Sequence, residues 1–243
     1  MIVSHNELTA AVNKAFLGMR LSCGEADVVA NMVVDLQMAG LHGVHHFNNA
    51  CTYLGLDLDR PADISVTGKN IIEVDLHNGS LACHLPVVMD YALESMVGLK
   101  SLKIEIKNCH NRWLAFSELV KLASKGIACY AKWSNGSSPK RTLYVINRGC
   151  VTPDVFFSEL ILDSDEKLQD MTIELSVQDF DIAHISKDYC TQVDANELIK
   201  AQNSAWKEGV FIDDAEWLSL KKTATAILVE NSQQSMNGAG GLV

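Results

Sequence analysis

The sequence predicts an α/β fold of the mixed α+β type, with helices at both ends of the chain beside a central β-sheet. Three observations support this class. Capping boxes mark two helices near the N-terminus, apolar residues alternate with period two from Ile64, and amphipathic helices return from Ala195. We therefore expect a helical subdomain made of residues 1–60 and 195–243, and an α/β sheet domain made of residues 61–194.

Two capping boxes predict where the first helices begin. They are Ser4-x-x-Glu7 and Ser22-x-x-Glu25, and each is followed by apolar residues at intervals of three and four. A third helical pattern runs from about Val44 to Leu56. The dipeptide His42-Gly43 therefore lies at a corner between two helices, where it can face another part of the molecule.

Alternating apolar residues from Ile64 to Leu76, interrupted by Gly68-Lys69-Asn70, predict a β-hairpin, and His77-Asn78-Gly79 predicts the next turn. Helices and strands then alternate up to a turn cluster at Ser134–Pro139, after which β-structure dominates. The remaining expected elements are helices at 85–99, 113–123, 195–206 and 214–229, and strands at 102–106, 127–133, 143–146, 158–162 and 171–177.

Composition limits the classes of partner. The chain has 243 residues, is 48% hydrophobic and carries a formal net charge of -10, without a dense cluster of Lys and Arg. Such a surface disfavours nucleic acid and anionic membranes, so we expect a small-molecule substrate and neither nucleic acid nor membrane as partner. The sequence has no segment of transmembrane length and no export signal, so a cytoplasmic protein is expected.

Seven cysteines, an odd number without a CxxC pair, are widely spaced and mostly lie in apolar surroundings such as Ile127-Ala128-Cys129-Tyr130. This pattern is typical of reduced, buried thiols in a reducing compartment. Because the Cys and His spacings of zinc sites are also missing, we expect no bound metal.

The best candidate for a chemical site is the histidine corner, which we define as His42, His45 and His46. Three imidazoles within five residues titrate near neutrality and suit proton transfer or the binding of a carboxylate. A structural role competes with this interpretation: His42 would bond a carbonyl at the corner, and His45 and His46 would lie on an exposed helix face. A zinc site is disfavoured, because Gly43 and the corner break the i, i+4 geometry of His42 and His46.

The corner resembles the Ser-His-Gly signature of the malate/L-lactate dehydrogenase family that does not use a Rossmann fold. Asp35-Leu36 and His42-Gly43 fall on its Asp-Leu-Arg-Gly-x-x-Ser-His-Gly-x-x-Arg run, while Leu41 replaces the serine and His46 the arginine. Relatives in that family include L-sulfolactate dehydrogenases, ureidoglycolate dehydrogenases and cyclic-imine reductases. The resemblance implies terminal helices packed beside a mixed or mainly antiparallel sheet, with His42 as the catalytic acid and with His45 and His46 holding the substrate carboxylate.

A second run of that family, Asn-Ser-x-His-Phe-Gly, helps to hold NAD(P) and falls on Asn108–Trp113. Asn108 agrees with it, Cys109 replaces its serine, and Asn111 and Trp113 replace its histidine and glycine, while His110 lies one position early. The resemblance implies that NAD or NADP is bound by Asn108, His110, Asn111 and Arg112.

The residues around this second run allow two interpretations. The backbone N–H groups of a strand-to-helix turn at His110-Asn111, together with Arg112, suit a phosphate, but Asn111 equally suits an ordinary N-cap. The bulky Trp113 occupies space that a glycine leaves to backbone or cofactor, which argues against conventional dinucleotide binding. The family's Gly-Thr-Asn-Pro segment has no counterpart here, and the chain also resembles an uncharacterised domain family with an Asn-Glu-Leu-like start and a Gly-Ala-Gly end.

Three functions therefore stay open. The first is an NAD(P)-dependent reductase of a small 2-oxo acid or cyclic imine, with His42 as the acid. The second is a non-enzymatic ligand-binding or interaction protein on the same fold, and the third is a cofactor-free isomerase in which His42 is the base and Arg112 steadies an enolate. By family analogy we expect a homodimer, anchored by Trp113, Trp133, Trp206 and Trp217. The sequence also holds an acid/base cluster to which it assigns no role, made of Asp179, Asp181, His184 and Asp188.

Overall fold

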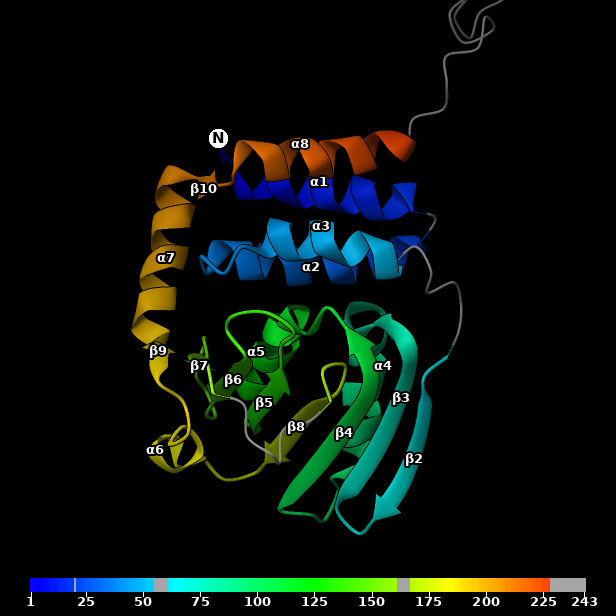
Figure 1. Cartoon of the computed structure of the whole chain (residues 1–243), viewed down its shortest axis with the longest axis vertical. Coiled ribbons are helices and arrows are strands. Elements are labelled where there is room, and N and C mark those ends of the chain that lie inside the picture. Colours follow the sequence, from blue (N-terminus) through cyan, green and yellow to red (C-terminus); the bar gives the residue numbers. More distant parts are fainter. Residues whose placement is uncertain (20, 55–60, 161–166, 228–243) are drawn as a thin grey trace, which may run out of the picture.

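A layer of helices lies on an α/β layer built around one large sheet (Figure 1). The computed structural model describes residues 1–19, 21–54, 61–160 and 167–227. The helices of the first layer are α1 (His5–Gly18), α2 (Cys23–Met38), α3 (Gly43–Leu54) and α8 (Asp214–Ala224).

The first two helices begin where their capping boxes predict. The Ser4 hydroxyl accepts a hydrogen bond from the Glu7 backbone N–H at 3.1 Å. At α2 the box is reciprocal, because Ser22 Oγ accepts from the Glu25 N–H and the Glu25 carboxylate accepts from the Ser22 N–H. Capping therefore sets the N-terminus of each helix, and burial of its apolar face holds it in the layer.

The sheet is mixed and mainly antiparallel, as expected for this fold class. Among the described residues, only β3 and β4 are parallel neighbours, and helix α4 (Leu81–Ser95) joins them. Every other neighbouring pair is antiparallel. In spatial order the strands are β2 (Asp63–Gly68), β3 (Ile71–Ser80), β4 (Ser101–His110), β8 (Met171–Ser176), β5 (Ala128–Ser134), β6 (Arg141–Ile146), β7 (Asp154–Ser158) and β9 (Thr191–Val193).

β4 and β7 differ clearly from their expected bounds. β4 runs on to His110 rather than ending at Ile106, because its pairing with β3 resumes after a bulge and places Gly79 opposite Cys109. The predicted turn at residues 77–79 therefore lies inside β3. The strand expected at 158–162 is instead β7, in which Val155 lies opposite Tyr144 and is fully buried.

Helix α4 also begins earlier than expected, at Leu81 rather than Leu85. Leu81, Ala82 and Leu85 are all buried, so the apolar face of the helix includes its first turn. The expected element ends at 55–56, 161–162 and 228–229 lie outside the described residues.

Helices α4 and α5 (Phe116–Ser124) pack on one face of the sheet, next to the 3-10 helix η1 (Arg112–Ala115). α2 packs on all three, so they join the helical layer to the sheet. The main cluster of buried apolar residues is continuous through both layers, from Leu8 in α1 to Ile173 in β8. The division into two domains stays a prediction.

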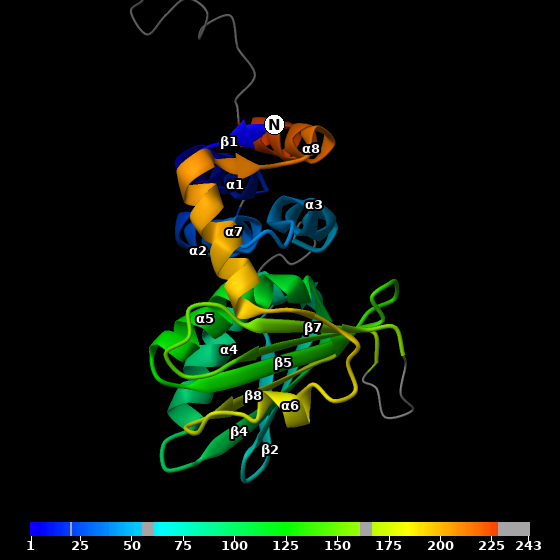
Figure 2. The same cartoon turned by 90° about the vertical axis from the view of Figure 1, so that its left-hand side faces the viewer.

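The two ends of the described chain meet in the helical layer. Helix α7 (Ala195–Glu208) crosses from the sheet to that layer (Figure 2). It leads to β10 (Val210–Phe211), which pairs antiparallel with β1 (Ile2–Val3) before α8 packs on α1. The remaining short helices are α6 (Ile182–Ile185) and η2 (Thr225–Ile227).

All seven cysteines are free thiols, but the expectation that they are buried is wrong for several of them. Cys109 and Cys129 are buried, whereas Cys23, Cys150 and Cys190 are exposed, because these three lie at a helix start and in loops. Across the described ranges, none of the helices combines the length and apolar character that crossing a membrane requires. The described side chains also contain no group of three or more His, Cys, Asp and Glu placed to hold a metal ion.

Candidate functional site

Gly43 gives the histidine corner its shape. A Cβ at this position would lie 2.1 Å from the Val33 carbonyl oxygen and 2.7 Å from the Gln37 backbone nitrogen. Gln37 also fixes the corner, because its Oε1 accepts a hydrogen bond from the Val44 N–H at 2.9 Å and its Nε2 donates to the Phe211 carbonyl at 2.9 Å. The close approach of α2 and α3 therefore requires glycine, which gives the His-Gly pair a structural role.

His42 precedes α3 and is exposed. Its backbone has a φ of 54°, in the left-handed region, and its carbonyl oxygen accepts the first hydrogen bond of the helix from the His46 N–H at 3.1 Å. The backbone of His42 therefore starts α3, while its imidazole faces solvent. Its catalytic role stays a prediction.

His45 has a partner on each ring nitrogen. Nδ1 lies 2.6 Å from Glu216 Oε1 on α8, and Nε2 lies 3.0 Å from the Asn49 amide nitrogen. Burial raises the pKa of the Glu216 carboxyl, but its hydrogen bonds with His45 and Asn48 outweigh burial and lower that pKa overall. The arrangement ties α3 to α8, and a substrate carboxylate would have to displace Glu216 from His45.

His46 points from α3 towards the sheet layer and stacks on Trp113. The ring centroids are 4.7 Å apart and the rings are inclined by 16°. Burial, reinforced by the nearby His45 and His42, lowers the pKa of His46 to about 3. The imidazole is therefore neutral at physiological pH and offers no positive charge to a carboxylate.

Trp113 belongs to a cluster of aromatic rings at the junction of the two layers. The centroid of its ring lies 5.9 Å from those of Trp133, Tyr144 and Phe157. Tyr144 is fully buried, and its hydroxyl has no hydrogen-bond partner within the described residues. Aromatic side chains therefore fill the junction beside His46.

A second ring stack holds the other end of α3. Tyr53 stacks on His110 with centroids 3.7 Å apart and an inclination of 10°. Burial, followed by the charge of Arg112, lowers the pKa of His110. Together, His46 on Trp113 and Tyr53 on His110 fasten α3 across the end of β4.

The other residues of the second run are engaged within the fold. The Asn108 amide donates to Asp75 Oδ1 at 2.9 Å, and Arg112 Nη1 donates to the Leu168 carbonyl. Asn111 occupies the N-cap position of η1 with a φ of 61°, but its side chain makes no capping bond. Its Oδ1 is buried, and no group in the described ranges donates to it.

These contacts test whether the junction fits a dinucleotide. The Asn108 amide is bound to Asp75, the His110 ring is covered by Tyr53, and the Trp113 indole is packed against His46. Only Asn111 Oδ1 among these positions is a buried polar atom without a partner in the described chain. As folded, this junction does not fit NAD or NADP.

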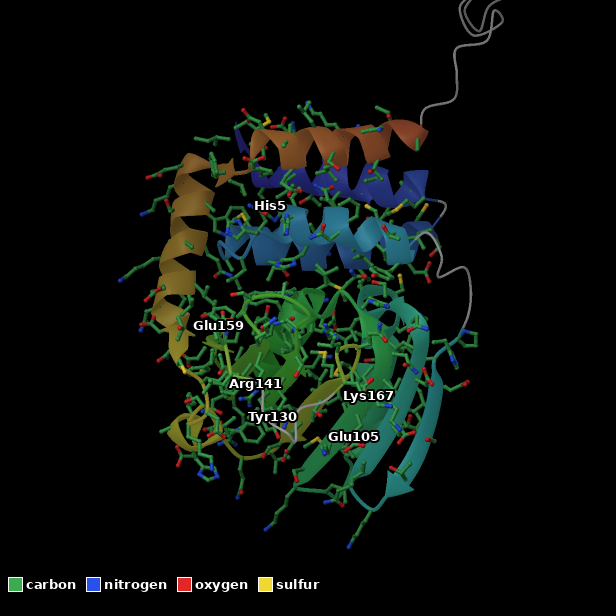
Figure 3. The ribbon with its side chains drawn as sticks, in the orientation of Figure 1. His5, Glu105, Tyr130, Arg141, Glu159 and Lys167 are labelled. Atoms are coloured by element: carbon green, nitrogen blue, oxygen red, sulfur yellow. The ribbon has the colours of Figure 1, made fainter. Side chains whose placement is uncertain are left out.

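A cavity of about 600 Å³ lies elsewhere, on the sheet. It is lined by residues of β5, β6 and β8, including Tyr130, Arg141 and Glu174, and by the loop around α6. Figure 3 labels Tyr130 and Arg141, both in the sheet layer, and His5 in the helical layer. The cavity collects the acid/base cluster of residues 179–188, to which the sequence assigns no role.

The sequence alone does not identify this cavity as a site. The available signal was the polar alternation of Tyr130 and Lys132 along one strand, which predicts a polar sheet face but not its neighbours. The neighbouring residues come from β6 and β8, and the sequence of a single segment does not specify which strands pair with it.

The tryptophans expected to anchor a homodimer are mostly used inside the protomer. Trp133 and Trp217 are buried and Trp113 is half-buried. Trp206 is 65% exposed and stacks on His5 with centroids 4.7 Å apart. The homodimer stays a prediction.

Comparisons with known proteins identify the fold. Residues 3–82 match a family model described as "Protein of unknown function (DUF3726)". No curated protein matches the chain. The match to an uncharacterised family therefore agrees with the second resemblance over the N-terminal third.

Solved structures match over most of the chain. A dehydrogenase from Sinorhizobium meliloti has a TM-score of 0.71 at 10% identity, covering 92% of this chain and 99% of that one. Malate dehydrogenase from Pyrococcus horikoshii OT3 has a TM-score of 0.69 at 11% identity, covering 96% and 97%. Delta1-piperideine-2-carboxylate reductase from Pseudomonas syringae pvar. tomato has a TM-score of 0.62 at 11% identity, covering 92% and 99%. At these identities the likeness shows a malate/lactate dehydrogenase-like fold and nothing of the activity.

Proposed function

We propose that this protein is a non-enzymatic, small-molecule-binding member of the dehydrogenase-like fold. The observation that carries the proposal is the stack of His46 on Trp113 at 4.7 Å. Trp113 occupies the position of the glycine in the family's cofactor run. His46, which packs on its indole, occupies the position of the family's substrate-binding arginine. Both positions are used to join the two layers.

The electrostatics of the corner support the same proposal. An arginine binds a carboxylate through two parallel N–H bonds, whereas His46 is neutral because its pKa is lowered to about 3. His45 is engaged by Glu216 on one nitrogen and by Asn49 on the other. Binding a 2-oxo acid here would require these contacts to break.

A second candidate is an NAD(P)-dependent reductase of a small 2-oxo acid or cyclic imine. The observation that favours it is the exposed imidazole of His42, which is accessible to a substrate at the corner. Proton donation to a carbonyl or imine needs an accessible histidine and does not depend on the replaced neighbours. This candidate also requires the Trp113 junction to open for the cofactor.

Titration with NADH and NADPH separates the two candidates. Binding is followed by tryptophan fluorescence and calorimetry, with a nicotinamide-dependent dehydrogenase as the positive control. For the binding protein we expect no saturable signal up to millimolar cofactor. Saturable binding in the micromolar range, with oxidation of NADH by a 2-oxo acid or cyclic imine that is lost in His42→Ala, would overturn the proposal and establish the reductase.

A Trp113→Gly variant tests whether the indole keeps a cofactor out of the junction. If the indole is what closes the junction, this variant gains measurable NADH binding while the wild type shows none. Trp206→Ala is the matched control, because Trp206 is exposed and far from the junction in the fold. Far-UV circular dichroism and thermal unfolding show whether each variant is folded.

A further inference from the structure

Another cavity lies in the helical layer, in a groove between α1 and α8, which we call the helix groove. Its volume is about 420 Å³, which is within the range of sites that hold small molecules. α1 and α8 pack on each other at the outer side of the helical layer (Figure 1). The lining residues are Glu7, Ala10, Ala11, Lys14, Trp217, Lys221, Ala224 and Thr225.

The helical spacing of these residues forms the groove. On α1, positions 7, 10, 11 and 14 have the spacing i, i+3, i+4, i+7 and therefore share one face. On α8, positions 217, 221 and 224 likewise share one face. Ala10, Ala11 and Ala224 have short side chains, so the groove between the two helices stays open.

The floor of the helix groove is apolar and continuous with the main core. Trp217 is 3% exposed and belongs to the main cluster of buried residues, and Ala11 and Ala224 are half-buried and pack against that cluster. Ala10 is exposed beside them. An alkyl chain laid on this floor would remove apolar surface from water, which favours binding.

Two lysines provide positive charge at the rim. Lys221 Nζ lies over the Trp217 ring, 5.2 Å from its centroid, so the ammonium is held beside the apolar floor. Within the described ranges, neither Lys14 nor Lys221 is paired with a carboxylate. Both ammonium groups can therefore bind an anion without breaking an ion pair of the fold.

The complete set of charges in the lining favours one anionic group. Glu7 is the acid among the described lining residues, and it lies about two helical turns before Lys14, so roughly 10 Å separates the two backbone positions. The net charge of -10 opposes an anion at long range. At physiological ionic strength, exposed charges more than about 8 Å away are largely screened, so the two lysines determine the local preference.

We propose that the helix groove binds a free medium-chain alkyl carboxylate, that is, a ligand of the fatty-acid class. The carboxylate binds the ammonium groups of Lys14 and Lys221, and the alkyl chain lies on Trp217, Ala11 and Ala224. This inference rests on the proposed binding function and names the class of its ligand.

Calorimetric titration with a length series tests the inference. The probes are butanoate, hexanoate and octanoate, with octanol and octylamine as probes of equal length that lack the negative charge. We expect octanoate to bind about tenfold more tightly than hexanoate, because two more methylene groups are buried, and at least fivefold more tightly than octylamine. Equal binding of octanoate and octylamine, or no dependence on chain length, would overturn the inference. An octanoate affinity that weakens as the protein concentration rises would show that a second copy covers the groove and would also overturn it.

Variants assign the binding to the groove. Lys221→Gln should weaken octanoate about threefold or more and leave octanol unchanged, because octanol carries no charge. Lys222→Gln is the matched control, since Lys222 is the next residue of α8 but lies outside the lining, and it should leave both affinities unchanged.

Ala10→Glu places a negative charge in the groove and should weaken octanoate at least tenfold. Ala10 is exposed, so this variant should fold, and circular dichroism checks that it does. Unchanged octanoate binding in folded Ala10→Glu and Lys221→Gln would refute the site. The NADH titration does not depend on the groove, so failure of the proposed function and failure of this inference are distinguishable.

Discussion

His46 and Trp113 stack face to face, with centroids 4.7 Å apart, and join the helical layer to the sheet layer. Burial keeps this imidazole neutral, because it lowers the pKa of His46 from an ordinary value of 6.5 to about 3. In the unfolded chain the same imidazole regains its ordinary pKa. Folding stability is therefore linked to pH through this one residue.

Acid should destabilise the protein through His46. Between the two pKa values the unfolded chain binds a proton that the folded chain does not, so the free energy of unfolding falls as the pH falls below 6.5. At about 1.4 kcal/mol per pH unit, the loss by roughly pH 4.5 is about 2 to 3 kcal/mol. His46→Phe keeps the ring stack and cannot titrate, so urea unfolding should give it a shallower pH dependence than the wild type. Parallel curves for the two proteins would show that His46 is not the cause.

Gly43→Ala should strongly destabilise the fold, because the new Cβ meets the Val33 carbonyl oxygen at 2.1 Å. We expect a loss of about 3 kcal/mol or more in the free energy of unfolding. Gly24→Ala in α2 is the matched control, since no atom lies within 4 Å of its added Cβ, and it should be neutral or stabilising by up to about 1 kcal/mol. Thermal and urea unfolding compare the two variants, and equal effects would contradict the close approach of α2 and α3.

Asp35→Asn should stabilise the protein at neutral pH. Burial raises the pKa of the Asp35 carboxyl, although the charges of Lys121 and His5 oppose the shift. Between the ordinary pKa of 3.8 and the higher folded pKa, the folded chain retains a proton that the unfolded chain has lost. The free energy of unfolding therefore falls as the pH rises through this interval. The asparagine variant removes that loss, so its advantage over the wild type should appear above this interval and disappear below it. A wild type that is more stable than the variant at neutral pH would argue against this assignment.

The predicted homodimer has a candidate contact surface in an exposed apolar patch. Ile2 and Phe211 are cross-strand partners in β1 and β10 and are 64% and 69% exposed, and Trp206 at the end of α7 is 65% exposed. Light scattering at micromolar concentration should therefore find a dimer, and Trp206→Ala should shift it towards monomer. Leu218→Ala, at an exposed position of α8, is the control. A monomeric wild type would contradict the prediction.

The N-terminal helices were predictable because their signals are local. Ser22 and Glu25 form a capping box within four residues, and the apolar spacing that follows determines which face of α2 is buried. The order of the strands was not predictable in this way. β8 lies between β4 and β5 although it follows both in the chain, and no local pattern specifies such pairing.

At the candidate site too, the local features were predictable and the long-range contacts were not. The sequence places His42, His45 and His46 at a helix corner, and the structure agrees, but the contacts that decide their chemistry come from distant segments. Glu216 reaches His45 from α8 and Trp113 reaches His46 from η1. The steric requirement for glycine at position 43 was also not predictable from the sequence, because it depends on how closely α3 approaches α2.

The pairing of β1 with β10, together with the packing of α8 on α1, has a consequence for how the protein is made. During synthesis, α1 and α2 leave the ribosome long before the segment that covers them. The side of α1 that packs on α8 and the side of α2 that packs on α7 stay exposed until those helices arrive, and contacts between such distant segments slow folding. Nascent chains that stop before residue 210 should therefore bind chaperones through this layer, and release should require the C-terminal helices.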